Sequence, residues 1–294
     1  MTAVYHLPGL FEFYDLYRAF LPLYRQHRDW FYPWCDIGSL YGAPADCLWG
    51  GGRVGDGEDR PREVAALLAE YGVSARLTFS NSLLREEHLS DPRCNALCEV
   101  FAQSGVETGA ILTSDLLLSY LREKYPAFYF VSSTTKVLTD FAQLEQELRR
   151  EAFRSVVPDF RLNKDFARLN ALPDALKQKV EFLCNECCHP ECRQRRACYE
   201  AVSRQSLGMD AAHTCPWAGE GGYRFSAAME RPTFIGVDDI QNVYLPAGFR
   251  HFKIEGRSLG SAVVLEFLLY YLTRPEHHLK VREAIYLDSA LDLF

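Results

Sequence analysis

The chain has 294 residues, of which 48% are hydrophobic and 24% charged, so it can bury a full-sized core. Its formal net charge of -7 argues against broad nucleic-acid binding, which uses basic surfaces. No segment has the length and apolarity of a membrane span, and the start of the chain does not resemble a secretory signal. We therefore expect a cytoplasmic protein whose ten cysteines stay reduced and serve metal or redox chemistry or lie in the core.

The first residues, Met1–Phe20, carry aromatic side chains at helical spacing and predict an amphipathic helix that packs on the main domain. After them, short apolar runs alternate with stretches of helical periodicity, the pattern of repeated βα units around a parallel sheet. The expected strands are Asp36–Leu40, Ala75–Ser80, Thr108–Leu112, Phe128–Ser132, Ser155–Asp159, Val180–Cys184, Thr233–Val237 and His251–Glu255. The expected helices include Arg62–Glu70, Pro92–Gln103, Ser114–Lys124, Phe141–Arg150, Glu191–Ser203, Asp239–Leu245 and Ser261–Leu272.

About eight such alternations in roughly 250 residues are what a (β/α)8 barrel requires. The predicted fold is therefore an α/β TIM-like barrel with an added aromatic-rich N-terminal helix. An open doubly wound sheet is the alternative, because periodicity alone does not show closure. We expect one domain over 1–294, with a helical cap at 1–34, the barrel at 35–274 and a tail or helix at 275–294.

In such barrels the active site lies at the C-terminal ends of the strands. The residues at these positions are unusually polar: Asn81, Lys136, Asn163, Asn185, Glu186, Glu255 and Arg257. One polar strand end is an ordinary loop or helix cap, but so many together indicate a polar cavity at the barrel mouth.

The segment LCNECCHPECRQRRACY, from Leu183 to Tyr199, holds five cysteines at the end of the sixth expected strand. Pro190 is expected to start the following helix, which places Cys188 just before its first turn and Cys192 inside it. The C-x-x-x-C spacing then puts both thiolates on one side, able to hold one metal centre. Cys198 is less convenient, because it points to a different face of a helix.

A third ligand is expected from Cys215, at the end of a loop that can fold back to this helix start. Three such thiolates can form an iron–sulfur site. The fourth ligand is Cys198, Cys187, Cys184 or the distant Cys47, or is absent. A zinc site with four cysteines is the alternative, and buried thiols without any metal are the third interpretation.

The other motifs carry less weight. The stretch WGGGRVGDG at Trp49–Gly57 resembles a phosphate-binding glycine loop, but it lacks the Lys-Ser/Thr pair, so a mobile loop over the barrel mouth is the simpler interpretation. Cys94 and Cys98 lie one turn apart on an expected helix and are assigned to the core. The chain contains no G-x-S-x-G and no H-E-x-x-H, so serine hydrolase and zincin activities have no support.

The segment FIGVDDI…YLPAGFRHFKIEGRS resembles the collagenase-like peptidase family of unassigned catalytic type, best over Val156–Arg257. Several members of that family are iron–sulfur proteins that hydroxylate RNA bases or quinone precursors without molecular oxygen. The resemblance implies a TIM-like barrel, a 4Fe-4S cluster, and Glu255 and Arg257 in or beside the site. Here the cysteine pattern is more compact than in the family, and the acidic balance does not suit an RNA substrate.

The sequence therefore predicts an iron–sulfur-dependent redox enzyme of the oxygen-independent hydroxylase type, with a small organic, anionic substrate and a protein partner or electron donor. The expected roles are Cys188, Cys192, Cys215 and Cys198 as metal ligands, Glu255 or Glu186 as proton-transfer groups, Arg257 and Lys136 as anion-binding groups, and Asn81, Asn163 and Asn185 as substrate-orienting groups.

Three alternatives stay open. Glu255 and Arg257 can instead form a mutual ion pair that closes the barrel end. The protein can instead be a zinc or metal-free barrel lyase or hydrolase that uses Lys136 as a Schiff-base amine. It can also be a non-catalytic, metal-stabilised partner subunit that binds through the aromatic N-terminal helix.

Overall fold

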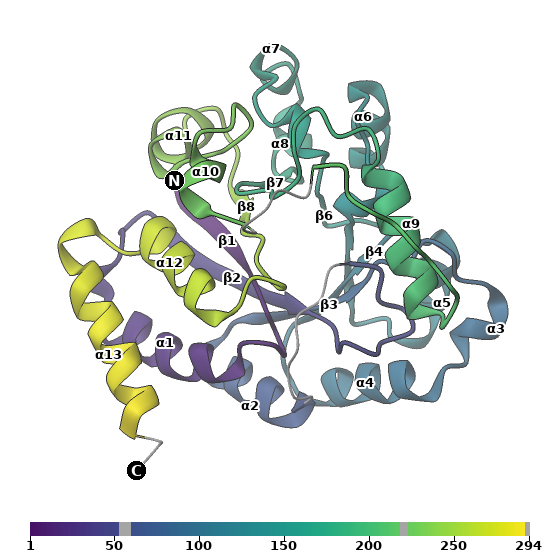
Figure 1. Ribbon diagram of the computed structural model, residues 1–294, viewed down its shortest axis with the longest axis horizontal. Coiled ribbons are helices and arrows are strands. Elements are labelled where there is room, and N and C mark those ends of the chain that lie inside the picture. Colours follow the sequence, from purple (N-terminus) through teal and green to yellow (C-terminus); the bar gives the residue numbers. More distant parts are fainter. Residues whose placement is uncertain (53–59, 218–222, 292–294) are drawn as a thin grey trace.

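Eight parallel strands lie side by side in the order β6–β5–β4–β3–β2–β1–β8–β7 in the computed structural model, which describes residues 1–52, 60–217 and 223–291 (Figure 1). The sheet closes between β6 and β7 through a parallel bridge of Val156 with Val180, where the Val156 N–H donates to the Lys179 carbonyl at 2.8 Å. The strands are β1 (Ala3–Pro8), β2 (Cys35–Gly42), β3 (Ser74–Phe79), β4 (Thr108–Leu112), β5 (Tyr129–Ser132), β6 (Ser155–Val156), β7 (Glu181–Leu183) and β8 (His251–Lys253). The predicted TIM-like α/β barrel is confirmed.

Helices surround this barrel (Figure 1). The α-helices are α1 (Tyr14–Gln26), α2 (Pro61–Tyr71), α3 (Glu86–Leu89), α4 (Pro92–Gln103), α5 (Asp115–Lys124), α6 (Phe141–Leu148), α7 (Phe166–Leu169), α8 (Asp174–Lys177), α9 (Arg195–Ser206), α10 (Phe225–Met229), α11 (Val237–Asp239), α12 (Ser261–Leu272) and α13 (His278–Leu291). Short 3-10 turns are η1 (Arg28–Trp30), η2 (Thr134–Lys136), η3 (Phe160–Leu162) and η5 (Pro275–His277), and η4 (Ile240–Tyr244) is a π-helical turn. None of the described helices has the length and hydropathy that crossing a membrane requires.

Local sequence signals account for several of these boundaries. The Asp91 side chain accepts a hydrogen bond from the Cys94 N–H at 2.7 Å and caps α4, whose first residue is a proline. Ser114 caps α5 in the same way. Gly72 ends α2 with a φ of 67°, the left-handed conformation that glycine adopts without steric cost.

The N-terminal prediction was wrong, because Ala3–Pro8 is β1, the barrel strand between β2 and β8. The barrel therefore begins at Ala3 and not at residue 35. The helix α1 starts only at Tyr14, and its aromatic spacing led to the assignment of the whole segment as helical. Tyr17 and Phe20 are fully buried in the core, so the aromatic stripe is not an exposed docking face.

The run Thr233–Val237 was predicted as the seventh strand but pairs with no strand. It contributes one backbone hydrogen bond, from the Ile235 N–H to the Cys184 carbonyl at 3.0 Å, and then enters α11. The run is apolar because Phe234 and Ile235 are buried under α12, not because it belongs to the sheet. The predicted count of eight strands was right only because β1 replaces this run.

The inside of the barrel holds two unlike layers. Nearer the C-terminal ends of the strands lie the apolar side chains of Tyr41, Ile111, Val131, Val157 and Leu183, which form one small cluster with Tyr129 at the start of β5. Beside it, Glu181 of β7 is completely buried and accepts a hydrogen bond from the Arg76 guanidinium of β3 at 2.7 Å. The interior is therefore a packed core, as in other closed barrels, but one that contains charge.

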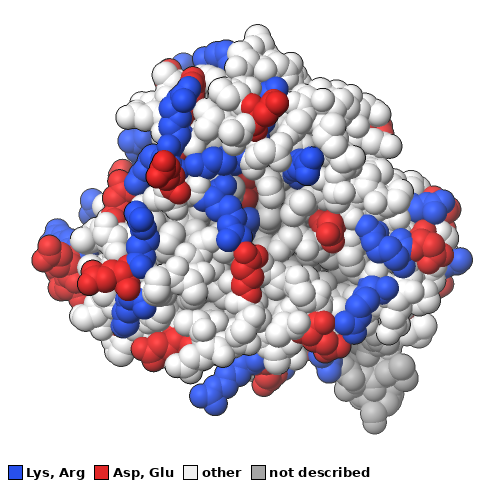
Figure 2. Space-filling model, turned by 180° about the vertical axis from the view of Figure 1, so that it is seen from behind, with Lys and Arg blue, Asp and Glu red and all other residues white. Residues whose placement is uncertain are grey.

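The molecular surface seen in Figure 2 carries charges of both signs. On this face the described Lys and Arg side chains are interspersed with Asp and Glu and do not gather into one broad field. A surface of this kind lacks the wide basic stripe that sequence-independent binding to a phosphate backbone uses.

Candidate active site at the barrel mouth

A cavity of about 70 Å³ opens at the C-terminal ends of the strands, and we call it the mouth cavity. Its apolar lining comes from Tyr41, Ile111, Val157 and Leu183, and its hydroxyl lining from Thr78, Ser80, Ser133, Thr134 and Thr135. Three charged side chains reach it from β8 and the residues that follow: Lys253, Glu255 and Arg257. Two of these, Glu255 and Arg257, are residues that the sequence predicted at the site.

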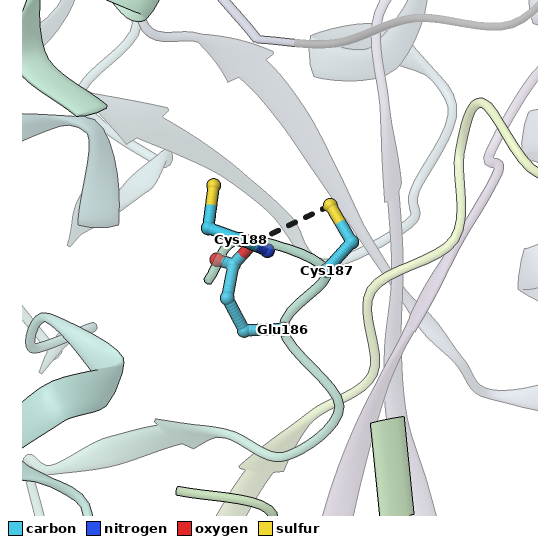
Figure 3. Close-up of side chains that lie close together, drawn as sticks. All are labelled: Glu186, Cys187 and Cys188. Carbon is cyan, nitrogen blue, oxygen red and sulfur yellow. Dashed lines mark hydrogen bonds between the residues drawn. The ribbon is translucent and has the colours of Figure 1, made fainter. Parts of the chain in front are cut away.

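The cysteine loop, residues 185–194, leaves β7 beside the end of β8. Glu186, Cys187 and Cys188 place a carboxylate oxygen and two sulfur atoms within 4.8 Å of one another, and the two sulfur atoms lie on the same side of the loop (Figure 3). Cys187 Sγ lies 3.5 Å from Glu186 Oε1 and 3.5 Å from Glu255 Oε1. This set of soft and hard donors can hold a metal ion.

Two buried or half-buried arginines hold the backbone of this loop in place. The Arg231 guanidinium donates to the carbonyls of Glu186 and Cys188, at 3.0 and 2.9 Å. Arg161 donates to the Cys192 carbonyl at 2.9 Å and pairs with Asp159 at 2.6 Å. The loop is thus shaped by side chains and not by a helix.

The helix start predicted at Pro190 was wrong, since α9 begins only at Arg195. Cys188 and Cys192 both precede the helix, so the helical argument for their facing one side does not hold. A turn joins His189 to Cys192 instead, in which the Cys192 N–H donates to the His189 carbonyl at 3.0 Å. Cys198 lies within α9 and is half-buried.

Cys215 is exposed and lies in the segment that returns toward the cysteine loop. Two residues later, the Trp217 ring stacks on the His189 ring, with centroids 3.7 Å apart and planes 3° from parallel. His189 lies between Cys188 and Cys192 in the loop, so the stack joins the two cysteine segments. The predicted folding back of this segment is therefore observed.

The four predicted ligands do not form one compact group. Cys192, Cys198 and Cys215 are not part of the group that lies within 4.8 Å in the described chain. The thiolates of a four-iron cluster bind separate irons and need not lie that close. Among the alternatives for the fourth ligand, Cys184 lies in the core, bonded to the Phe182 carbonyl, and Cys47 Sγ lies 3.4 Å from Cys94 Sγ in another part of the core.

The three predicted substrate-binding asparagines are buried and are bonded to the protein backbone. Asn81 donates to the carbonyls of Leu48 and Ser203. Asn163 likewise donates to two carbonyls, and Asn185 and Glu255 exchange a pair of hydrogen bonds of 3.0 and 2.7 Å between side chain and backbone. Their side-chain amides therefore link the ends of strands to backbone carbonyls of other segments.

The predicted anion-binding lysine is not in the cavity. Lys136 forms a 2.6 Å ion pair with Glu147 of α6, behind β5. The lysine that lines the mouth cavity is Lys253, which the sequence analysis missed. A signal for it was present, because Lys253, Glu255 and Arg257 alternate along one extended segment and so share a side.

The mutual ion pair considered for Glu255 and Arg257 does not form. Arg257 Nε pairs instead with Glu12 Oε1 at 2.7 Å, and Nη2 donates to the Ala43 carbonyl at 2.7 Å. Its third nitrogen, Nη1, lies on the side of Gly52, where an added Cβ would meet it at 3.8 Å. Arg257 thus presents one nitrogen toward the cavity lining.

The glycine-rich stretch enters the mouth through its first residues. Gly51 packs against Ser80, the residue that follows β3, because a Cβ there would lie 2.4 Å from the Ser80 carbonyl oxygen, and Gly52 lines the mouth cavity. The rest of the predicted mobile loop, 53–57, lies outside the described residues. The described part agrees with a segment lying over the mouth.

Burial lowers the pKa of Lys253 to about 7, and Glu181 only partly opposes this effect. An unfolded lysine titrates near 10.4, so between pH 7 and pH 10 the unfolded chain binds a proton that the folded chain does not. This proton difference makes the folded state more stable as pH rises, by up to about 1.4 kcal/mol per pH unit. We expect Lys253→Met to remove that dependence and to be more stable than the wild type at pH 7, with a difference that shrinks by pH 9. Urea unfolding of both proteins at the two pH values measures it, and a difference independent of pH would contradict it.

Comparison with known proteins gives a match at the level of structure. No protein-family model and no curated protein sequence matches the chain. Among solved structures, one titled "The Structure of the U32 Peptidase Mk0906" is similar, with a TM-score of 0.51 and 12% identity, over 87% of this chain and 93% of that one. The resemblance to the collagenase-like peptidase family is thus confirmed as a likeness of fold.

Proposed function

We propose that this protein, whose barrel is similar to that of a U32 peptidase, is an iron–sulfur-dependent redox enzyme of the oxygen-independent hydroxylase type. Its substrate is organic and anionic and binds at the barrel mouth. The observation that carries the proposal is the stacking of Trp217 on His189, which brings the Cys215 segment to the cysteine loop. Trp217, two residues after Cys215, thus lies against the residue between Cys188 and Cys192.

The donor set fits such a group. Cys188, Cys192 and Cys215 are the proposed ligands, and Cys198 or Cys187 is the fourth. Thiolates are the ligands of iron–sulfur clusters, and the loop that offers them lies at the C-terminal end of a barrel strand, where catalytic groups of this fold are found. Cys187 and Cys188 are half-buried, so the site is shielded from solvent but not closed.

A bound 4Fe-4S cluster supplies one-electron chemistry, and an electron-donor protein is the partner that this role requires. The residues of the chain supply the rest. The Glu255 carboxylate lines the mouth cavity within reach of Cys187 and is the proposed group that accepts or donates a proton at the reacting carbon. Arg257, held by Glu12, orients an anionic group of the substrate, and the apolar lining excludes water.

One observation favours a second function. The compact group of Glu186, Cys187 and Cys188 matches a single ion such as zinc, which takes carboxylate and thiolate ligands at one centre. A zinc-dependent lyase or hydrolase would use the same mouth cavity. A Schiff-base role for Lys136 is not part of this alternative, because its ion pair with Glu147 holds it away from the cavity.

Anaerobic purification followed by a visible absorption spectrum and assays of iron, acid-labile sulfide and zinc tests the proposal. We expect a brown protein that contains iron and sulfide. A colourless protein with bound zinc would favour the second function. A protein that stays colourless and metal-free after anaerobic reconstitution would contradict both.

Matched variants locate the metal. Cys188→Ala and Cys192→Ala are expected to lose the colour and most of the iron, while Cys98→Ala, a fully buried cysteine of α4, keeps them. Trp217→Ala is expected to retain less iron than the wild type, because it removes the stack that brings Cys215 back. Equal iron content in Cys188→Ala and Cys98→Ala would show that the cysteine loop is not the site.

A further inference from the structure

We propose that Lys253 binds a carboxylate in the mouth cavity together with Arg257, and that the cavity takes a small, apolar monocarboxylate. This inference deepens the proposed function, since it defines the substrate side of the same site. It rests on the geometry and charge of residues inside the barrel and does not require a metal.

The Lys253 amine is buried but has no hydrogen-bond acceptor in the described chain. The residue is 6% exposed and lines the mouth cavity, with Nζ 3.4 Å from the centroid of the Tyr41 ring. The nearest carboxylate oxygen, Glu181 Oε1, is 3.9 Å away, beyond hydrogen-bond distance. A water between these two atoms would use one of three ammonium donors, so the others still lack acceptors. A buried amine of this kind is costly unless a ligand supplies the acceptor.

The other charged groups around Lys253 have contacts of their own. Glu181 accepts from Arg76 at 2.7 Å and from Ser155 at 2.9 Å, both at Oε2, while Oε1 accepts no hydrogen bond in the described chain and lies 3.9 Å from Lys253 Nζ. Arg257 is paired with Glu12. Glu255 accepts from the backbone N–H of Cys187 at 3.2 Å.

The two nearby histidines do not supply a charge that pairs with Lys253. Burial lowers the pKa of His6 and of His251, so both rings are neutral near pH 7. His6 Nδ1 bonds with Ser39, and its Nε2 bonds with His251. Within the described residues, Lys253 Nζ thus has no anion at hydrogen-bond distance, and an incoming carboxylate would supply one.

The other residues that line the cavity determine which kind of carbon skeleton the ligand can have. Tyr41, Ile111, Val157 and Leu183 offer an apolar lining, and Ser133 and its neighbours offer hydroxyls at the rim. About 70 Å³ is the space of roughly five waters, if each water needs about 15 Å³. A small apolar body with a single carboxylate matches this lining, and benzoate is the probe.

Carboxylate binding at Lys253 should be accompanied by proton uptake, which apolar packing alone does not produce. Burial, aided by the charges of Arg76 and Arg257, lowers the pKa of Lys253 to about 7, while Glu181 and Glu255 raise it. At pH 8 the free protein therefore holds mostly the neutral amine. A carboxylate bound beside Nζ favours the charged form, so benzoate binding takes up a proton.

The test is calorimetric titration of benzoate into the purified protein at pH 8, in two buffers of different ionisation enthalpy. We expect saturable binding with uptake of most of one proton. Lys253→Met is expected to bind at least about tenfold more weakly and without proton uptake, since a charge-assisted hydrogen bond is lost. Lys253→Arg is expected to keep binding without proton uptake, because arginine is always protonated.

Lys179→Met is the matched control, since this half-buried lysine donates to the Arg150 carbonyl at the opposite end of the barrel. It is expected to bind benzoate with the wild-type affinity and proton uptake. Absence of saturable binding by the wild type, or unchanged affinity and proton uptake in Lys253→Met, would overturn the inference. Benzoate binding is measured apart from colour and iron, so its failure and the failure of the iron–sulfur proposal are separate results.

Discussion

Replacing Glu181 by Gln is expected to lower the free energy of unfolding by about 3–5 kcal/mol, which is the usual cost of removing one partner of a buried ion pair. Glu181 is completely buried in the barrel, 2.7 Å from Arg76 and 3.9 Å from Lys253. The substitution keeps the size of the side chain but leaves the Arg76 guanidinium buried without its anion. Chemical denaturation near pH 7 measures the loss.

The Glu181–Arg76 pair also makes the free energy of unfolding depend on pH in the acidic range. Burial alone would raise the pKa of Glu181, but Arg76 and its neighbours hold it well below the usual range. A carboxyl group with a lowered folded pKa stabilises the fold above its unfolded pKa, near 4.3, and loses that contribution as pH falls below it. Glu181→Gln should therefore lose less stability than the wild type between pH 5 and pH 3.

A double substitution separates charge from packing. Glu181→Leu with Arg76→Met removes both charges of the pair, and Lys253 can release its proton, so the double variant should be more stable than the sum of the single effects predicts. A cost below about 1 kcal/mol for Glu181→Gln would show that the pair is not shielded from water.

The fold was predictable because its signals are local. Seven of the eight strands follow from short apolar runs bounded by turn residues, and the bounds of α4 and α12 agree with their predicted ranges. The strand β1 was missed because its six residues are immediately followed by the aromatic spacing of α1, and helical periodicity over a long segment outweighs a short buried strand. Thr233–Val237 has strand-like composition, but only pairing makes a strand.

The sequence predicted the residues of the site only where their position at a strand end places them at the barrel mouth. Glu255 and Arg257 lie at a strand end, and the barrel places strand ends at the mouth. Their partners could not be read from the chain, because Glu12 is 245 residues away from Arg257. Asn81, Asn163 and Asn185 are as polar as substrate-binding residues. A single sequence does not distinguish an asparagine that hydrogen-bonds to the backbone from one that binds a substrate.

Replacing Arg195 by Met is expected to destabilise the protein by about 3 kcal/mol or more and to reduce its iron content. Arg195 is 1% exposed, lies 2.5 Å from Glu186 Oε2 and 3.6 Å from Asp159 Oδ2, and packs over the Phe160 ring. Asp159 keeps Arg161 as a partner, but Glu186 loses its buried cation. Because Glu186 also accepts the Cys188 N–H at 2.9 Å, its displacement would disturb the cysteine loop. Denaturation and iron assays on the same preparation measure both effects.

Arg193→Met is the matched control for this experiment, because Arg193 is an exposed arginine of the same loop and its loss should change stability by no more than about 0.5 kcal/mol. Adding Glu186→Leu to Arg195→Met removes the carboxylate that Arg195 paired with and should restore part of the stability, but it also removes the oxygen that accepts the Cys188 N–H. We then expect the free energy of unfolding to recover in part, because the buried carboxylate is gone. The iron content should stay low, because the metal site requires the cysteine loop to be held in one conformation. If Arg195→Met and Arg193→Met unfold at the same denaturant concentration, the Glu186–Arg195 pair does not support the loop.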